Sequence, residues 1–376
     1  MRVIFAAGGT AGHINPALAI ADKVKSIFPD TEILFIGTPN GMESRLVVKA
    51  GYDFEGVEMS GFQRRISPKA AVLNVKAAYR YLVSAKLAVR KIIKRFKPDL
   101  AVGTGGYVTA TVLGQAAAMG VKTVTHESNS YPGMATKMLC TKADKVFLAS
   151  EDAMKFLKDT SKCVITGNPL RTNIPIEERS EARKRLGIDD GFTVLSFGGS
   201  LGANTITESV AALIAWEQKT GGINHIHAYG KGRGEVFTNA LQKNGARADD
   251  KRLDIREYID NMYTCMCAAD LIVSRSGAMS ITELTEIGRP SVLVPYPNAA
   301  ENHQYYNAMT LVNENAAVLI LDKDLTGEAL VREVSELYND REKLAQMEKN
   351  AARMKKPNAA DKILSEIVDL MGKENF

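Results

Sequence analysis

The run Val3–Ala7 and the turn that follows it, Gly8-Gly9-Thr10-Ala11-Gly12-His13, decide the fold. An apolar run, a glycine turn and a helical pattern, in this order, are typical of phosphate sites in α/β proteins. Glycine lets the backbone approach an anion, and a helix N-terminus offers unpaired N–H donors and a partial positive charge. The second half repeats the unit as Val194–Phe197 followed by Gly198-Gly199-Ser200-Leu201-Gly202-Ala203. We therefore expect two α/β domains that face each other across a cleft.

Neither turn has the G-x-G-x-x-G spacing of dinucleotide-binding proteins, which disfavours a hydride-transfer enzyme. The length of 376 residues favours two domains, and 45% hydrophobic with 24% charged residues is typical of soluble globular proteins. No apolar stretch is long enough for a transmembrane helix. The first residues resemble a short signal peptide, but they end in the glycine turn, so we expect a core strand and a cytoplasmic protein. The pair Cys265 and Cys267 has no second ligand pair nearby, which favours buried thiols over a metal site.

Short apolar runs alternate with helical patterns through both halves, which predicts two doubly wound parallel sheets of Rossmann type. Gly167-Asn168-Pro169 interrupts this alternation with a turn signal. We place the domain boundary there, which gives domains at 1–166 and 167–356. The tail 357–376 contains a helical pattern that is expected to pack back on the first domain. The predicted strands are Val3–Ala7, Glu32–Ile36, Leu100–Gly103, Thr123–Thr125, Lys145–Leu148, Val194–Phe197, His225–Tyr229, Leu271–Val273, Ser291–Val294 and Val318–Leu321.

The net charge of +5 is unevenly distributed along the chain. The segment from Arg64 to Lys97 holds eleven basic residues and no acidic one, and the rest of the chain has 37 basic against 43 acidic residues. Apolar side chains interleave with the basic ones at helical spacing. A core helix with a solvated face, a nucleic-acid patch and a membrane-docking surface all fit such a pattern, but no nucleic-acid motif accompanies it.

Polar clusters follow several of the predicted strands, where ligands bind in open α/β sheets. In the second half these are Ser274–Glu283, with an anion-binding helix start at Ser276-Gly277, and the polar run Glu301–Asn307. Glu283 is placed to accept hydrogen bonds from a ribose diol. In the first half, His13 is a candidate base at a helix start, and Gly103–Tyr107 and His126–Asn129 line the same rim.

The chain resembles the MurG family of peptidoglycan N-acetylglucosaminyltransferases, which have the GT-B fold. The resemblance covers nearly the full length and rests on seven motifs in order. These are Gly8–Pro16, Gly103–Val108, His126–Asn129, Gly167–Thr172, Gly198–Ala203, Ser274–Glu283 and Asn302–Asn307.

The resemblance implies an inverting transfer of N-acetylglucosamine from UDP-N-acetylglucosamine to undecaprenyl-linked muramyl-pentapeptide, with a β1→4 bond, at the cytoplasmic face of the cell membrane. The first domain would bind the acceptor and the membrane, and the second the donor. No cofactor, metal or nucleic acid is expected, since helix N-termini and Arg171 can stabilise the departing diphosphate. A peripheral attachment to anionic lipid is then the preferred reading of the basic segment.

Matching motif positions imply roles for individual residues. His13 would be the catalytic base and Asn129 would face the acceptor with it. The residues implied to bind the donor are Thr10, Gly12, Arg171, Gly199, Ser200, Ile259, Ser276, Gly277, Ala278, Glu283 and Gln304. Those implied to line the acceptor site are Gly105, Gly106, Tyr107, His126 and Glu127. Those expected to meet the membrane are Arg64, Arg65, Leu73, Lys76, Tyr79, Arg80 and Leu82.

Two positions depart from the family pattern. His303 stands where the family commonly has the first of two glutamines, and Leu201 replaces a glutamine in the second glycine turn. The contact of Gln304 with the donor sugar is therefore the firmer of the two. A lipid glycosyltransferase acting on diacylglycerol, a UDP-sugar-binding module and a sugar-nucleotide epimerase are the alternatives. The first would differ from the main reading at His126–Asn129.

Overall fold

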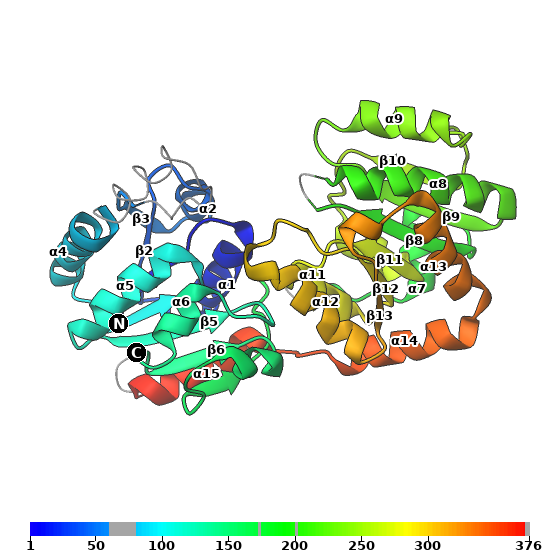
Figure 1. The fold of residues 1–376 in the computed structure, drawn as a ribbon. Coiled ribbons are helices and arrows are strands. Elements are labelled where there is room, and N and C mark those ends of the chain that lie inside the picture. The colour runs from blue at the N-terminus through cyan, green and yellow to red at the C-terminus, as the bar shows by residue number, and fades with distance from the viewer. Residues whose placement is uncertain (60–79, 172–173, 200–201, 373–376) are drawn as a thin grey trace. The chain divides into compact units, whose positions relative to one another are not determined.

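A computed structural model describes residues 1–59, 80–171, 174–199 and 202–372, although not the side chains of 80–82. The chain divides into two compact units, Met1–Thr172 with Pro357–Phe376, and Asn173–Lys356. Each unit contains one parallel sheet with helices on both faces (Figure 1), which confirms the predicted fold class.

Unit 1 is built on a sheet of seven strands in the order β3-β2-β1-β4-β5-β6-β7. Its strands are β1 (Arg2–Ala6), β2 (Glu32–Gly37), β3 (Asp53–Gly56), β4 (Leu100–Gly103), β5 (Lys122–Glu127), β6 (Lys145–Leu148) and β7 (Cys163–Ile165). Its α-helices are α1 (Ala11–Ile27), α2 (Met42–Lys49), α4 (Lys86–Phe96), α5 (Gly106–Ala118), α6 (Met134–Leu139) and α15 (Ala359–Met371). A π-helical stretch, η1 (Arg80–Ala85), precedes α4, and η2 (Glu151–Phe156) is a 3₁₀ helix.

Alternate residues of β1 face opposite sides of this sheet, as the period of a strand requires. Val3 and Phe5 pack in one hydrophobic cluster with α1 and α15, whereas Ile4 and Ala6 pack in another with α4 and α5. Ile363 in the C-terminal helix, red in Figure 1, is fully buried in the first cluster. The tail therefore completes a core that begins with the first strand.

Unit 2 has six strands in the order β10-β9-β8-β11-β12-β13. They are β8 (Phe192–Phe197), β9 (Ile223–Ala228), β10 (Leu253–Arg256), β11 (Leu271–Ser274), β12 (Ser291–Leu293) and β13 (Ala317–Leu319). Its α-helices are α7 (Arg179–Leu186), α8 (Asn204–Thr220), α9 (Gly234–Lys243), α10 (Met262–Ala268), α11 (Ala278–Ile287), α12 (His303–Asn313), α13 (Gly327–Asn339) and α14 (Arg341–Arg353). The short 3₁₀ helices are η3 (Ala300–Asn302) and η4 (Asp322–Asp324).

The structure adds three strands that the sequence reading missed, namely β3, β7 and β10. Two of them, β3 and β7, are the edges of the first sheet, and β10 is an edge of the second. None of their residues is fully buried, so they lack the apolar runs that revealed the central strands. The first helix begins at Ala11, which places His13 in its first turn.

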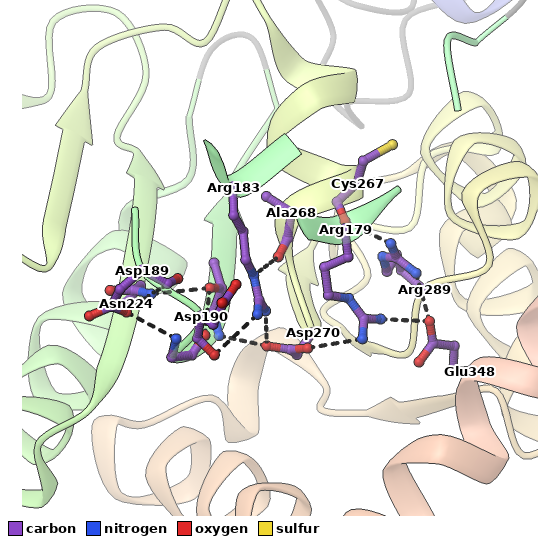
Figure 2. A network of polar contacts seen from close by, with 12 residues as sticks. Arg179, Arg183, Asp189, Asp190, Asn224, Cys267, Ala268, Asp270, Arg289 and Glu348 are labelled. Atoms are coloured by element: carbon purple, nitrogen blue, oxygen red, sulfur yellow. Dashed lines mark hydrogen bonds and ion pairs between the residues drawn. The ribbon is translucent and has the colours of Figure 1, made fainter. Parts of the chain in front are cut away.

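An ion-pair network joins the first and last helices described in unit 2 (Figure 2). Asp270 accepts from Arg183 of α7 at 2.5 Å and lies 3.3 Å from Arg179 of the same helix. Glu348 of α14 pairs with Arg179 at 2.6 Å and with Arg289 at 2.7 Å. Because several charges share partners, the network holds both helices to the ends of the central strands more firmly than isolated surface pairs would.

Candidate active site

In unit 1, the strands that carry the first and third glycine turns are neighbours, since β1 pairs with β4. Helices leave the two strands toward opposite faces, so their carboxyl ends flank the crevice where open α/β sheets bind ligands. The turns lie in close contact. A Cβ at Gly106 would lie 2.5 Å from the Gly8 carbonyl oxygen, and one at Gly105 would lie 2.5 Å from His13 Cδ2. Both glycines have a positive φ, 116° at Gly105 and 80° at Gly106, so no other residue fits this contact.

The side chain of His13 is oriented by the turn from which it projects. Its Nδ1 lies 3.0 Å from the Gly8 carbonyl oxygen, which can only accept a hydrogen bond. Nδ1 therefore carries the proton in the neutral ring, and Nε2 is the atom able to accept one. Nε2 has no hydrogen-bond partner among the described residues. Thr104 secures the backbone by donating its hydroxyl to the His13 carbonyl oxygen at 2.7 Å.

Thr10 and Gly12, the two donor-binding candidates in this turn, frame the start of α1. Thr10 is exposed and its side chain makes no capping hydrogen bond, and the first turn contains no acidic residue. The helix N-terminus therefore keeps donors and positive potential that can meet an anion.

A buried carboxylate that the sequence reading missed supports the first glycine turn. Glu43 Oε1 accepts from the Thr38 amide at 2.9 Å and from the Thr38 hydroxyl at 2.6 Å, and Oε2 accepts from the Gly9 amide at 3.3 Å. Burial alone would raise the pKa of Glu43, but these hydrogen bonds outweigh it and hold that pKa below its usual value. Burial raises the pKa of the neighbouring Tyr107, and the Glu43 charge adds to this. The available signal was an acidic residue in the first turn of the helix that follows the predicted strand Glu32–Ile36.

The motif after β5 is a hydrogen-bonded loop in which Glu127 is the central acceptor. Its Oε1 accepts from the backbone and side-chain amides of Asn129 at 3.0 and 3.1 Å. Its Oε2 accepts from the Gly133 amide at 2.8 Å and the Thr136 hydroxyl at 2.7 Å. Glu127 is 4% exposed, so these bonds use a carboxylate that is hidden from solvent. The two hydrogen bonds to Oε1 hold Asn129 in place.

His126 lies beneath that loop with no exposed surface. Its Nε2 lies 3.1 Å from the Gly167 carbonyl oxygen and its Nδ1 lies 3.5 Å from the Ser128 hydroxyl. Burial lowers the pKa of His126, which keeps the ring neutral. This residue joins the loop to the segment that leads out of unit 1.

Arg171 belongs to the same unit, near its boundary. Its Nε donates to Asp22 Oδ2 on α1 at 2.9 Å, and Tyr52 donates to the other oxygen of Asp22 at 2.7 Å. The guanidinium is 42% exposed, so this ion pair is a weak surface contact.

The second glycine turn follows β8 and opens α8, at the centre of the second sheet. Gly199 has a φ of 88° and Gly202 has a φ of 69°, and the Gly202 amide donates to the Gly199 carbonyl oxygen at 2.8 Å. A Cβ at Gly198 would lie 2.3 Å from the Ala203 nitrogen. The turn is therefore so tight that glycine is required. No side chain caps α8, whose first turn contains no acidic residue. Ser200, the phosphate-binding candidate within this turn, lies outside the described residues.

Two further donor-site candidates lie at neighbouring strand ends. Ile259 follows β10 with its side chain 2% exposed, and neither its N–H nor its C=O has a partner in the described part of the chain. Glu283 on α11 receives one hydrogen bond, from the Tyr263 hydroxyl at 3.3 Å. Burial raises the pKa of Glu283 to about 7, and the bond from Tyr263 offsets only part of this effect.

Ser276 and Gln304 are joined directly. The Ser276 hydroxyl donates to the Gln304 carbonyl oxygen at 2.8 Å, and Asn307 donates to the Ser276 carbonyl oxygen at 3.2 Å. Gln304 Oε1 accepts from the Tyr296 amide at 2.9 Å, so the amide group of this side chain is left to present its N–H donors. Gly277 precedes α11, which begins at Ala278 without a side-chain cap or an acidic residue in its first turn.

An ion pair that the sequence reading did not single out ties these loops together. Arg275 Nη1 lies 2.5 Å from Asp322 Oδ1, 3.1 Å from the Pro295 carbonyl oxygen and 3.2 Å from that of Val294. Thr205, in the first turn of α8, donates to Asp322 at 2.7 Å and accepts from Arg275 at 3.2 Å. The pair links the start of α8 to the loop that holds Gln304.

A Glu217–His225–Ser196 arrangement in unit 2 has the order of a hydrolase triad. Glu217 lies 2.7 Å from His225 Nδ1, and His225 Nε2 lies 2.7 Å from the Ser196 hydroxyl. All three side chains are buried, at 2%, 1% and 0% exposure. No substrate can reach them, so this is a polar connection within the core rather than a nucleophilic centre.

The membrane candidates Arg64, Arg65, Leu73, Lys76 and Tyr79 lie outside the described residues, as do the side chains of Arg80 and Leu82. The described end of the basic segment is α4, where Lys91 and Lys94 are exposed and Leu87 is 53% exposed. Among the described helices, none is long and apolar enough to cross a membrane.

Two family models match the chain in succession. The glycosyltransferase family 28 N-terminal domain matches residues 3–148, and the glycosyltransferase family 28 C-terminal domain matches residues 193–363. The first match lies within unit 1, and the second covers most of unit 2 and continues into the C-terminal segment of unit 1 as far as residue 363. The two matches include both glycine turns.

Curated relatives match over nearly their whole length. A protein of Acetivibrio thermocellus is 43% identical over 372 residues, which covers 99% of this chain and 98% of the relative. One of Desulforudis audaxviator is 40% identical over 377 residues, covering 99% of each chain. Both are named UDP-N-acetylglucosamine–N-acetylmuramyl-(pentapeptide) pyrophosphoryl-undecaprenol N-acetylglucosamine transferase.

Solved structures resemble the chain as well. MurG of Acinetobacter baumannii superposes with a TM-score of 0.78 at 26% identity, covering 99% of both chains. The UDP-GlcNAc 2-epimerase of Neisseria meningitidis superposes with a TM-score of 0.63 at 13% identity, over 98% of this chain and all of the other. The epimerase shares the fold alone. The chain belongs to glycosyltransferase family 28, among its MurG-type transferases.

Proposed function

We propose that the protein transfers N-acetylglucosamine from UDP-N-acetylglucosamine to the muramyl sugar of an undecaprenyl-pyrophosphoryl-N-acetylmuramyl-pentapeptide. The observation that carries this proposal is the 43% identity over 372 residues to a transferase of that name, because it runs through both units. The product carries a β1→4 bond and serves peptidoglycan synthesis.

Unit 2 binds the donor in this proposal. The free backbone groups of Ile259 suit the polar edge of uracil, and Glu283 accepts from the ribose hydroxyls. The diphosphate lies at the turn of Gly199 and Ser200, against the start of α8. Ser276, Gly277 and Ala278 form a second helix start beside it, and the side-chain amide of Gln304 donates to oxygen atoms of the sugar.

Unit 1 binds the acceptor and supplies the base. The acceptor hydroxyl oxygen forms a bond to the anomeric carbon as the bond from that carbon to the diphosphate oxygen breaks. The hydroxyl proton passes to His13 Nε2, and the electron pair of the broken bond leaves with UDP. The tautomer imposed by the Gly8 carbonyl suits this step, which is worth roughly 10²–10⁴-fold in rate.

The remaining acceptor-side residues hold the lipid-linked sugar. Gly105 and Gly106 bring backbone close to the base, Tyr107 lies beside them, and Asn129 presents its side chain from the loop anchored by Glu127 and His126. Thr10 and Gly12 place the N-terminus of α1 near the reacting charge. Arg171 binds the diphosphate through its Nη groups, since its Nε donates to Asp22.

We also propose that the protein works at the cytoplasmic face of the cell membrane as a peripheral protein. The segment from Arg64 to Lys97 would dock on anionic lipid, at about 1 kcal/mol per basic residue near the surface. Replacing Arg64, Arg65, Lys69, Lys76 and Arg80 with Gln should weaken co-sedimentation with anionic vesicles but not folding. Equal sedimentation with neutral vesicles would contradict the docking role.

Transfer of radiolabelled sugar from UDP-N-acetylglucosamine tests the function. We expect the label to move to a lipid-linked muramyl-pentapeptide acceptor, and not to diacylglycerol. Conversion of UDP-N-acetylglucosamine to its 2-epimer without an acceptor would instead support the epimerase reading. Binding of the sugar nucleotide without any turnover would indicate a binding module.

A further inference from the structure

Arg233 lies next to the second glycine turn although it is far from it in the sequence. It precedes α9, and its amide donates to the Gly230 carbonyl oxygen at 3.2 Å. A Cβ at Gly202 would lie 2.8 Å from Arg233 Cδ and 2.9 Å from its Nε. The stem of this arginine therefore lies against Gly202. Glycine is required there because φ is 69° and a Cβ would lie 2.2 Å from the Tyr229 carbonyl oxygen.

The guanidinium of Arg233 has no partner within the described residues. Its Nε is buried and makes no hydrogen bond, and no carboxylate pairs with the group. The nearby Glu257 accepts from the Gly232 amide at 2.9 Å instead. Nine other arginines of unit 2 are paired with a carboxylate, namely Arg179, Arg183, Arg185, Arg247, Arg252, Arg256, Arg275, Arg289 and Arg332. Arg341 instead lies over the rings of Phe192 and Tyr338, and Arg353 is exposed to solvent.

A buried donor such as this Nε without an acceptor is unfavourable for the folded protein, since it has lost its hydrogen bonds to water and gained none in exchange. Such exceptions call for an explanation, and a bound anion supplies one. The location supports this. Gly199 and Gly202 form a turn at the N-terminus of α8, where the helix dipole favours negative charge and the first turn holds no acidic residue.

We propose that Arg233 binds the diphosphate of the donor, an inference that rests on the proposed function. A guanidinium matches phosphate oxygens with parallel N–H donors, which a single ammonium group cannot do. Because the diphosphate gains charge as its bond to the sugar breaks, Arg233 stabilises the leaving group as well as the bound donor. The contact recognises the phosphates only, and leaves uracil and ribose to Ile259 and Glu283.

The test compares Arg233→Gln with Lys231→Gln in the full-length protein, using calorimetry with UDP and with uridine. Lys231 is an exposed cation on the same loop, so it controls for a general loss of positive charge. In Arg233→Gln, we expect affinity for UDP to fall at least tenfold at 0.1 M salt, with affinity for uridine unchanged. Lys231→Gln should bind both as the wild type does, and Arg233→Lys should recover part of the loss.

Thermal unfolding separates binding from structure. Without ligand, Arg233→Gln should unfold at the same temperature as the wild type or higher, because the substitution removes an unpaired donor. Its UDP-induced stabilisation should shrink. Equal loss of UDP and uridine binding, or unchanged UDP binding, would overturn the assignment to Arg233 and leave the donor proposal standing. Failure of the wild type to bind UDP would overturn both.

Discussion

The carboxylates Glu43 and Glu283 stand at the glycine-rich sites of units 1 and 2, and their surroundings differ. Glu43 accepts three hydrogen bonds from Thr38 and Gly9, which hold its pKa below the usual value. Glu283 accepts one, from Tyr263, and burial raises its pKa to about 7. A glutamate therefore stabilises the fold in unit 1, where Glu43 has its acceptors occupied. In unit 2, Glu283 can still accept further hydrogen bonds.

The same contrast extends to the groups around them. In unit 1, Glu127 accepts four hydrogen bonds. The one ring atom of His13 that can still accept a proton is Nε2. In unit 2, the backbone of Ile259 and the guanidinium of Arg233 are without partners in the described residues. A site that orients one base is built rigidly, whereas a site that binds a large charged ligand keeps its hydrogen-bonding groups for that ligand.

The largest effect is expected at the base. His13→Ala should lower kcat by roughly 10²-fold or more, because the proton of the acceptor hydroxyl loses its recipient. Affinity for UDP, measured by calorimetry, should barely change, since the imidazole of His13 is proposed to contact the acceptor and not the nucleotide. A fall in kcat of less than about tenfold would place the base elsewhere.

Glu43→Gln should destabilise the protein by about 1–3 kcal/mol, because an amide cannot accept from all three donors. Denaturant unfolding measures this, with the exposed Glu32→Gln as the control. The lowered pKa of Glu43 means that its contribution is present above the pKa of the unfolded chain, near 4.5, and is lost as the pH falls through the lower folded value. Equal free energies of unfolding for the two variants would show that the hydrogen bonds of Glu43 do not stabilise the fold.

Glu283 should make donor binding depend on pH near 7. The ionised carboxylate is the stronger acceptor for ribose hydroxyls, so affinity for UDP should rise several-fold from pH 6 to pH 8. Calorimetry on Glu283→Gln provides the comparison, since the titration of UDP itself is common to both proteins. The variant should bind more weakly and lose the extra pH dependence. Identical profiles would refute the ribose contact.

The raised pKa of Glu283 also has a consequence for stability. Its contribution is fully present below the pKa of the unfolded chain and is lost as the pH rises through about 7. Without UDP, Glu283→Gln should therefore gain stability relative to the wild type between pH 5 and pH 8, which thermal unfolding can follow.

The smallest effect is expected at the ion pair of Arg275 and Asp322. Asp322→Asn should raise the KM for the donor about threefold with little change in kcat, because the loop that holds Gln304 is less well positioned. Asp324→Asn, on the same short helix, is the control. A matching loss in both variants would assign the effect to the helix rather than to the pair.

The central part of both sheets could be predicted from the sequence. Central strands such as β1 and β8 are almost completely buried and mostly apolar, and glycine turns follow them directly. The candidates His13 and Glu283 were found for the same reason, since each lies on the helix that follows such a strand and its glycine turn. The role of Gln304 was instead implied by the family resemblance. Edge strands such as β3 carry half-exposed residues and no such signal.

What the sequence by itself determined is therefore local: the order of strand, glycine turn and helix, and the candidates attached to it. Only the tertiary structure decided which neighbours each polar group meets. Glu43 supports Gly9 from 34 positions away, and Arg233 lies against Gly202 from another strand end. The physical reason is that a pKa, a tautomer or an unpaired donor depends on atoms within a few ångströms, whatever their distance along the chain.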